Sequence, residues 1–155
     1  MIDYNDKIKM DVKNTTKNVI FYLVKRLGII EGRKKLMKLM FLVEHLDIQK
    51  SNLSKDPFIG NKFIIYHYGV FSFGVMDSYI ELIHEGKIED GIPIRIRPTQ
   101  ESEIPEDIKS RVNKVIELFG KKDGYELEIK TIEMLGLNLS NKRECFGRSI
   151  KELIK

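Results

Sequence analysis

The sequence predicts one domain of the α+β class, mostly helical, with a winged-helix-like core, a small antiparallel sheet and extra C-terminal helices. Apolar residues recur at helical spacing along most of the chain, and the elements follow the order helix, helix, strand, helix and hairpin. Its 155 residues are close to the usual size of one domain. We therefore expect residues 1–155 to form a single domain with a candidate arm (1–14), a winged-helix-like core (15–98) and C-terminal helices (99–155).

The composition is typical of a folded protein with a well-charged surface, because 42% of the residues are hydrophobic and 32% are charged. The net charge of +4 is mild, so it permits a nucleic-acid or acidic partner without requiring one. The sequence has no apolar run long enough to span a membrane, its first residues have no apolar stretch, and Cys145 is its one cysteine. We expect a cytoplasmic protein without membrane association or an internal disulfide.

The stretch Gly32–Asp47 is predicted to form the central helix. Its apolar residues recur in steps of three and four, and further apolar residues widen that face beyond a simple stripe. A helix this apolar must be covered on two sides, so we expect the segments before and after it to pack against it.

The first turn of this central helix is basic and contains Arg33, Lys34, Lys35 and Lys38. These charges have the wrong sign for the partial positive charge at a helix N-terminus. Their placement indicates an anionic partner, whereas the alternative is that long basic side chains at a helix edge are simply solvated.

A first helix is predicted to begin at Thr15 or Thr16, because either hydroxyl can cap free backbone amides. Gly28 can end this helix in a left-handed conformation. Residues 1–14 have no clean apolar period, so they are compatible with a strand, a fraying helix or an arm.

After the central helix and a polar loop, residues 62–69 alternate as a strand that Gly69 is expected to break. Ser72 can cap the next helix, and Gly86 is placed to end it. The predicted buried stripe of that helix comprises Met76, Tyr79, Ile80 and Ile83.

Residues 87–98 are predicted to form a hairpin around an Asp90-Gly91 turn, or a loop followed by a strand, at the edge of the sheet. We expect Ile94 and Ile96 to face inward and Arg95 and Arg97 to face outward. The remainder is predicted to be helical. A helix starts near Pro105 and ends at Gly120, a capping box of Asp123 and Glu126 starts another, and Ser149 with Glu152 is expected to cap the last turns.

The element order indicates a winged-helix module, in which a basic wing and one helix meet nucleic acid. The candidate nucleic-acid-binding residues are Arg33, Lys34, Lys35, Lys38, Arg95 and Arg97. The helix that should enter the groove is instead acidic, which disfavours base contacts. A DNA-binding transcriptional regulator is one predicted function.

Catalytic and metal-binding patterns are missing from the sequence. The three histidines, His45, His67 and His84, have no zinc-like spacing with each other or with Cys145. No serine elbow, Cys-His signature or paired carboxylates are present. We therefore expect no enzyme activity, no metal and no cofactor.

The most specific local pattern is Tyr66-His67-Tyr68-Gly69-Val70-Phe71-Ser72. With the earlier KLMKLMFLVEHLD and the following helix, it resembles the Panacea antitoxin domain and the related YwgA-like proteins over roughly residues 15–90. Val70 stands where those families usually have Pro. The Panacea resemblance implies a non-enzymatic, mainly helical domain that neutralises a toxin or acts as an adaptor.

The second predicted function is therefore binding to a protein partner such as a toxin. The candidate partner-binding residues are Tyr66, Tyr68, Gly69 and Phe71. Phe71 is expected to be either a core residue or an exposed anchor, since large aromatics serve both purposes. The sequence leaves the oligomeric state open and is compatible with a homodimer.

Overall fold

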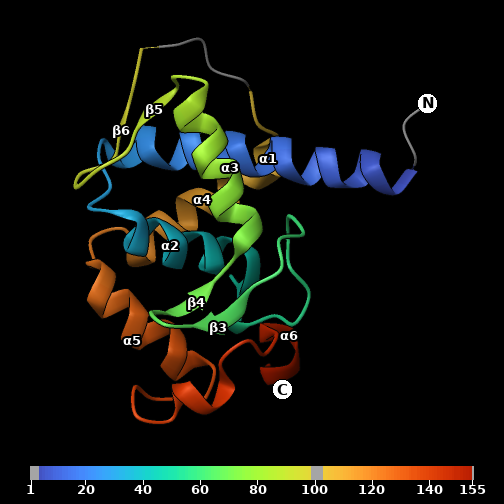
Figure 1. Ribbon diagram of the computed structural model, residues 1–155, viewed down its shortest axis with the longest axis vertical. Coiled ribbons are helices and arrows are strands. Elements are labelled where there is room, and N and C mark those ends of the chain that lie inside the picture. The colour runs from blue at the N-terminus through green and yellow to red at the C-terminus, as the bar shows by residue number, and fades with distance from the viewer. Residues whose placement is uncertain (1–3, 99–102, 155) are drawn as a thin grey trace.

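A long helix, α1, runs across the upper part of the molecule in Figure 1, where α3 crosses it and the β5–β6 hairpin lies beside its C-terminal part. Below it in this view lie α2, α5, α6 and the β3–β4 hairpin. This computed structural model describes residues 4–98 and 103–154, with side chains from residue 11 onward within those ranges. The protein is of the α+β class and 54% helical, as predicted. The helices are α1 (Tyr4–Leu27), α2 (Arg33–His45), α3 (Phe73–His84), α4 (Glu106–Phe119), α5 (Gly124–Met134), the 3-10 helix η1 (Lys142–Cys145) and α6 (Ile150–Leu153).

The first helix begins at Tyr4, about three turns before the predicted start. Thr16 does not cap it, because its hydroxyl donates to the carbonyl of Val12 (2.6 Å) inside the helix. That hydroxyl also accepts from the amide of Asn61 (2.7 Å), so a residue expected to cap the helix instead ties it to a later loop. The end of α1 is as predicted, with Gly28 at a φ of 83°.

The second helix, α2, is the centre of the domain, as predicted. Every residue from Lys35 to His45 is buried, and the helix contacts α1 through the shared apolar core and α3, α4 and α5 directly. Arg111 of α4 donates to the carbonyls of Val43 (2.5 Å) and Leu46 (2.6 Å), and so ties α4 to the end of α2.

The strands form three separate antiparallel pairs. They are β1 (Leu46–Asp47) with β2 (Asn52–Leu53), β3 (Ile64–Tyr66) with β4 (Gly69–Phe71), and β5 (Ile88–Glu89) with β6 (Arg95–Ile96). The predicted hairpin at residues 87–98 is present, with Ile94 buried and Arg95 and Arg97 exposed.

The predicted strand at residues 62–69 is present but shorter, because β3 covers only Ile64–Tyr66 before the chain turns at His67-Tyr68 and returns as β4. Gly69 does not break the strand but starts its return, with a φ of 90°. A β-carbon at this position would lie 3.3 Å from side-chain atoms of Glu128 and Ile132 on α5. Glycine is therefore required here both by its backbone conformation and by the close approach of α5.

Ser72 caps α3 as predicted, because its side chain accepts from the amide of Val75 (3.2 Å). The buried face of α3 is shifted from the prediction. Tyr79 is fully buried, and it is flanked by Val75 and Leu82, whereas Met76, Ile80 and Ile83 are only partly buried.

Two capping boxes were predicted near the C-terminus, and one forms. Asp123 and Glu126 cap α5 reciprocally, but the side chain of Ser149 makes no capping hydrogen bond to α6. Glu152 instead faces Arg148 at 3.6 Å. Among the described helices, none combines the length and apolar character needed to cross a membrane.

Candidate functional site

The β3–β4 hairpin and the start of α3 expose an unusual number of aromatic rings. Tyr68 is 68% exposed, Phe73 63% and Tyr66 38%. Together with the partly buried Phe71 and Phe146, these three residues form what we call the aromatic surface. Most soluble surfaces carry large apolar side chains singly, so a contiguous group of this kind is typical of an interaction site.

Four rings of the aromatic surface, those of Tyr66, Phe71, Phe73 and Phe146, form a contacting group. The centroid of Phe71 lies 4.9 Å from that of Phe73 in an edge-to-face arrangement, and Tyr66 lies 5.7 Å from Phe71 and 6.4 Å from Phe146. Such pairs restrict the side chains before any partner binds. The surface is therefore partly ordered in the free protein.

Local structure explains why these rings face outward. Side chains alternate across a strand, so burial of Ile65 directs its neighbour Tyr66 to solvent. Phe73 follows directly after the capping residue Ser72, at the first position of α3, where the helix leaves the core. Phe71 satisfies neither predicted role completely, because it is half-buried in the core and also contacts two exposed rings.

Ion pairs between Glu128, Lys34 and Lys142, which we call the charged clamp, support this hairpin. Glu128 of α5 is 4% exposed, and its carboxylate receives Lys34 at 2.6 Å and Lys142 at 2.8 Å. Burial alone would raise the pKa of Glu128, but hydrogen bonds from Lys142 and Lys34 outweigh it and lower the pKa. Lys142 also donates to the carbonyl of His67 in the turn (2.8 Å), so one side chain links the turn to the buried carboxylate.

Lys34 has a second role in this clamp. Its ammonium lies 4.9 Å from the ring centroid of Tyr68 and 5.9 Å from that of Tyr125 on α5. A cation over aromatic rings contributes about 0.5–1 kcal/mol at exposed sites. The most exposed ring of the aromatic surface is thus positioned by a residue that the sequence assigned to nucleic acid.

An apolar cavity of about 300 Å³ opens between α2, the hairpin and α3. It is lined by Met37, Tyr68, Phe71 and Met76, with Arg33, Lys34 and Lys38. The aromatic surface therefore borders a small hollow rather than a flat face.

The six predicted nucleic-acid-binding residues are not brought together on one face. Lys35 and Lys38 are 4% and 2% exposed and donate to the backbone carbonyls of Gly120 (2.7 Å) and Val70 (3.0 Å). Lys35 also pairs with Glu31 at 2.9 Å. Neither lysine is accessible to a nucleic acid in this structure, because both side chains are used inside the protein.

Arg33 is likewise engaged, in a two-pronged ion pair with Asp90 at 2.7 and 3.1 Å. The guanidinium of Arg33 holds the pKa of Asp90 at about 2, and the hydroxyl of Tyr79 donates to the same carboxylate. Arg95 and Arg97 remain on the outer side of β6, where Arg95 faces Glu89 across the hairpin.

Several residues of this site had no recognisable sequence signal. Glu128, Lys142 and Phe146 come from segments 60 to 80 positions after the hairpin, so nothing local marks them as its neighbours. The exposure of Phe73 had a usable sequence signal. A large aromatic side chain directly after a helix cap reaches the core less easily than side chains later in the helix.

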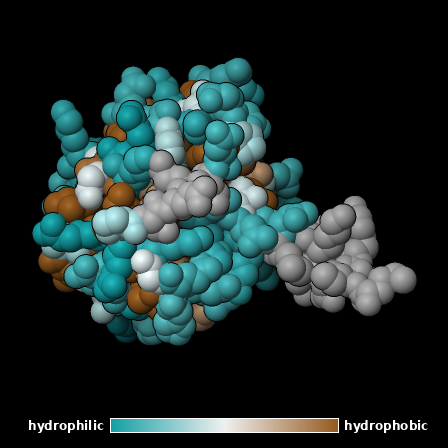
Figure 2. Space-filling view, turned by 90° about the horizontal axis from the view of Figure 1, so that it is seen from above, coloured by the Kyte–Doolittle hydropathy of each residue, from teal (hydrophilic) through white to brown (hydrophobic). Residues whose placement is uncertain are grey.

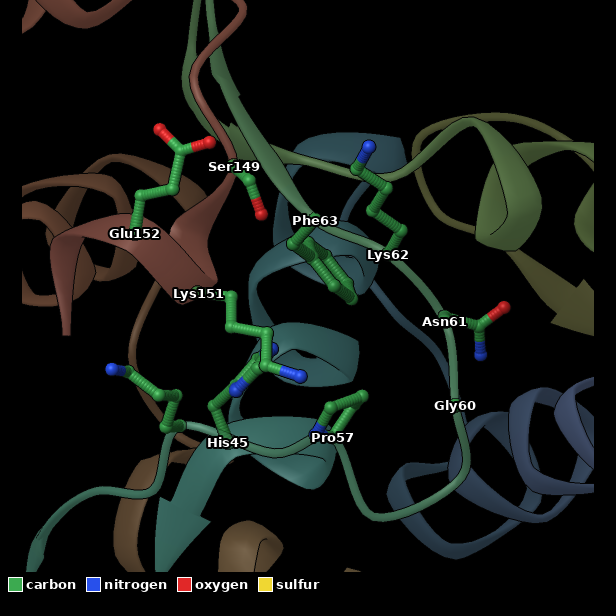
Figure 3. Close-up of a pocket in the computed structure, with 10 residues that line it drawn as sticks. His45, Pro57, Gly60, Asn61, Lys62, Phe63, Ser149, Lys151 and Glu152 are labelled. Atoms are coloured by element: carbon green, nitrogen blue, oxygen red, sulfur yellow. The ribbon is translucent and has the colours of Figure 1, made fainter.

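A larger, more polar hollow of about 570 Å³ lies between the end of α2, residues 55–63 and α6 (Figure 3). Phe63 and Lys151 point into it, whereas Asn61 points away toward α1. His45 lines this hollow, and burial lowers its pKa, so the ring is neutral near pH 7. The described residues contain no group of three or more acidic, histidine or cysteine side chains arranged for a metal.

Seen from above α1, the molecule is mostly hydrophilic, with hydrophobic side chains in separate patches (Figure 2).

Comparison of the chain with protein-family models, curated proteins and solved structures returned no significant match.

Proposed function

We propose that this protein is a non-catalytic cytoplasmic regulator that binds a protein partner through the aromatic surface. The observation that carries the proposal is the exposure of Tyr68 and Phe73, which are 68% and 63% accessible. Phe73 contacts Phe71, and Tyr68 lines the same cavity as Phe71. Tyrosine and other aromatics dominate the binding energy of protein interfaces. The resemblance to the Panacea antitoxin domain makes a toxin the first partner to test.

The rigidity of the hairpin supports this proposal. Binding costs free energy when side chains must be ordered, so a surface that is already held in place loses less on association. Here the turn is tied to Glu128 through Lys142, and Tyr68 is positioned by Lys34. Besides stabilising the fold, the clamp thus orders the turn and Tyr68 before a partner binds.

The test is to co-produce the protein with the product of the gene adjacent to its own. If that product is toxic, the wild-type protein should restore growth and co-purify with it. The double variant Tyr68→Ser/Phe73→Ser should do neither, because it removes the exposed rings without touching the core.

Ile92→Ser is the matched control, since Ile92 is 86% exposed in the β5–β6 loop and lies outside the aromatic surface. It should behave as the wild type. Full rescue by the Tyr68→Ser/Phe73→Ser variant would overturn the assignment of this surface.

Nucleic-acid binding is the second candidate, and one observation favours it. Ile30, between α1 and α2, exchanges backbone hydrogen bonds with Ile94 (3.1 and 2.6 Å), which adds a third extended segment to the β5–β6 hairpin. Three helices with such a hairpin are the arrangement of a winged helix, in which α3 would face DNA and β5–β6 would be the wing. Arg95 and Arg97 are exposed on this wing.

The charge of α3 disfavours this second candidate. Asp77 and Glu81 lie on it, although Lys13 of α1 pairs with both and so reduces their repulsion of phosphates. Titration of duplex DNA at two salt concentrations, with wild type and Arg95→Gln/Arg97→Gln, tests the candidate. Salt-sensitive binding that the variant weakens supports it, and the absence of salt-sensitive binding removes it.

A further inference from the structure

Lys38 combines deep burial with an adjacent cavity. It is 2% exposed in the middle of α2, and its Nζ donates to the carbonyl of Val70 at 3.0 Å. Val70 lies in the chain between Tyr68 and Phe71, and the side chains of both, together with Lys38, line the cavity of about 300 Å³. Lys38 thus lines an apolar hollow, and its amine is hydrogen-bonded to the hairpin beside that hollow.

The charges around this amine are unbalanced. Lys34 from its own helix and Lys142 from η1 both pair with Glu128 of α5, so three lysines surround one carboxylate. Lys34 and Lys142 each donate to this carboxylate, whereas the acceptor of Lys38 is the neutral carbonyl of Val70. It is therefore the lysine that can lose its proton at the least cost.

Burial lowers the pKa of Lys38 to about 7, with Glu128 opposing the change and Lys34 and Lys142 reinforcing it. An exposed lysine has a pKa near about 10.4, so less than about one in a thousand of its amines is neutral at pH 7. About half of Lys38 is neutral at the same pH. A neutral amine in an apolar pocket is a nucleophile toward carbonyl groups.

We propose that Lys38 and this cavity form a site that captures a small apolar aldehyde as an imine. The walls supplied by Met37, Phe71 and Met76 favour an apolar body. Arg33 is already paired with Asp90, and Lys34 with Glu128, so the ligand needs no acidic group to balance the rim. The volume is at the lower end of small-molecule pockets, which limits the ligand to a short chain or a single ring.

The chemistry balances without a further reactant. The nitrogen lone pair of Lys38 attacks the carbonyl carbon and forms a carbon–nitrogen bond, and proton transfer to the oxygen gives a carbinolamine. Loss of that oxygen as water gives the imine, and addition of water reverses the reaction. Nothing is oxidised or reduced, so the aldehyde is the one co-reactant required.

The test is to treat the folded wild-type protein with butanal and cyanoborohydride at about pH 7, then to quantify alkylation at each lysine by mass spectrometry of peptides. The hydride traps the imine as a stable secondary amine. Lys38 should be labelled at least about tenfold faster than Lys130, which is exposed on α5.

Lys35 is the matched control for burial, because it lies on the same helix, is 4% exposed and does not line the cavity. It should remain almost unlabelled. Labelling of Lys38 at or below the level of Lys35 would overturn the proposal.

A second variant tests the cavity itself. Met76→Trp should fill the hollow, and labelling of Lys38 should then fall while that of Lys130 stays the same. Unchanged labelling of Lys38 in this variant would show that the aldehyde does not enter through the cavity, and would contradict the site. Lys35 reports on the fold in the same sample, because its labelling would rise if the variant unfolded and exposed it.

Discussion

The basic end of α2 and the β3–β4 hairpin differ in which of their side chains reach solvent. Lys35 and Lys38 are charged residues that lie inside the protein, whereas Tyr68 and Phe73 are aromatic residues that lie outside it. Each region reverses the usual rule that charge is exposed and aromatic surface is buried. The comparison teaches that the basic residues here support the fold, and that the exposed rings are the better candidates for contact with a partner.

The largest effect is expected from breaking the clamp that joins these two regions. Glu128→Gln leaves Lys34 and Lys142 without their shared carboxylate in a buried setting, so the free energy of unfolding should fall by about 3 kcal/mol. Urea denaturation measures this change. Glu133→Gln, at an exposed position of the same helix, should change it by less than about 0.5 kcal/mol.

If both variants unfold at the same urea concentration, the clamp contributes little to stability. The hairpin would then be held by its apolar contacts and by the hydrogen bond from Lys38 to Val70. Its aromatic surface would have no special link to α2.

A smaller loss is expected from Gly69→Ala. This position has a φ of 90° and would place a β-carbon 3.3 Å from atoms of Glu128 and Ile132, so we expect a loss of about 2 kcal/mol. Gly86→Ala is a matched control, because its φ is 73° and no heavy atom lies within 4 Å of the added carbon. It should lose only about 1 kcal/mol.

Thermal melts of both glycine variants separate backbone strain from steric contact. Equal losses would mean that α5 yields to the added methyl group. The close approach between hairpin and α5 would then not be what requires glycine.

Many features of the fold were predictable because their signals are local. The spacing of apolar residues predicted α2. The capping residue Ser72 predicted the start of α3, and the Asp123–Glu126 capping box predicted the start of α5. The hairpin turn was missed because a glycine that breaks a strand and a glycine that begins its return look alike in sequence.

The exposure of the site residues was not predictable in the same way. Lys35 forms an ion pair with Glu31 and donates a hydrogen bond to the carbonyl of Gly120, which is 85 positions away in the chain. Lys38 donates a hydrogen bond to the carbonyl of Val70, which is 32 positions away. Backbone carbonyls carry no sequence signal, so a buried lysine and a solvated one have the same local pattern.

The smallest stability effect is a pH dependence that distinguishes the two buried lysines. The pKa of Lys38 falls to about 7 in the folded protein and is near 10.4 in the unfolded chain, so between these values the unfolded chain binds more protons. Stability should therefore rise with pH across this window, by about 1 kcal/mol between about pH 7 and 8.

Lys38→Met should abolish this rise, and Lys35→Met should leave it in place. Denaturant midpoints of the three proteins at the two pH values provide the measurement. A rise that persists in Lys38→Met would assign the titration to another group.

The central claim is that the aromatic surface binds the partner while contributing little to the fold. Calorimetric titration of the partner with Tyr68→Ser/Phe73→Ser, beside the free energy of unfolding of the same variant, tests it most directly. We predict an affinity at least about tenfold weaker and an unfolding free energy within about 1 kcal/mol of the wild type. Unchanged affinity in this variant, with a loss in Arg95→Gln/Arg97→Gln instead, would contradict the claim and place the partner on the β5–β6 hairpin.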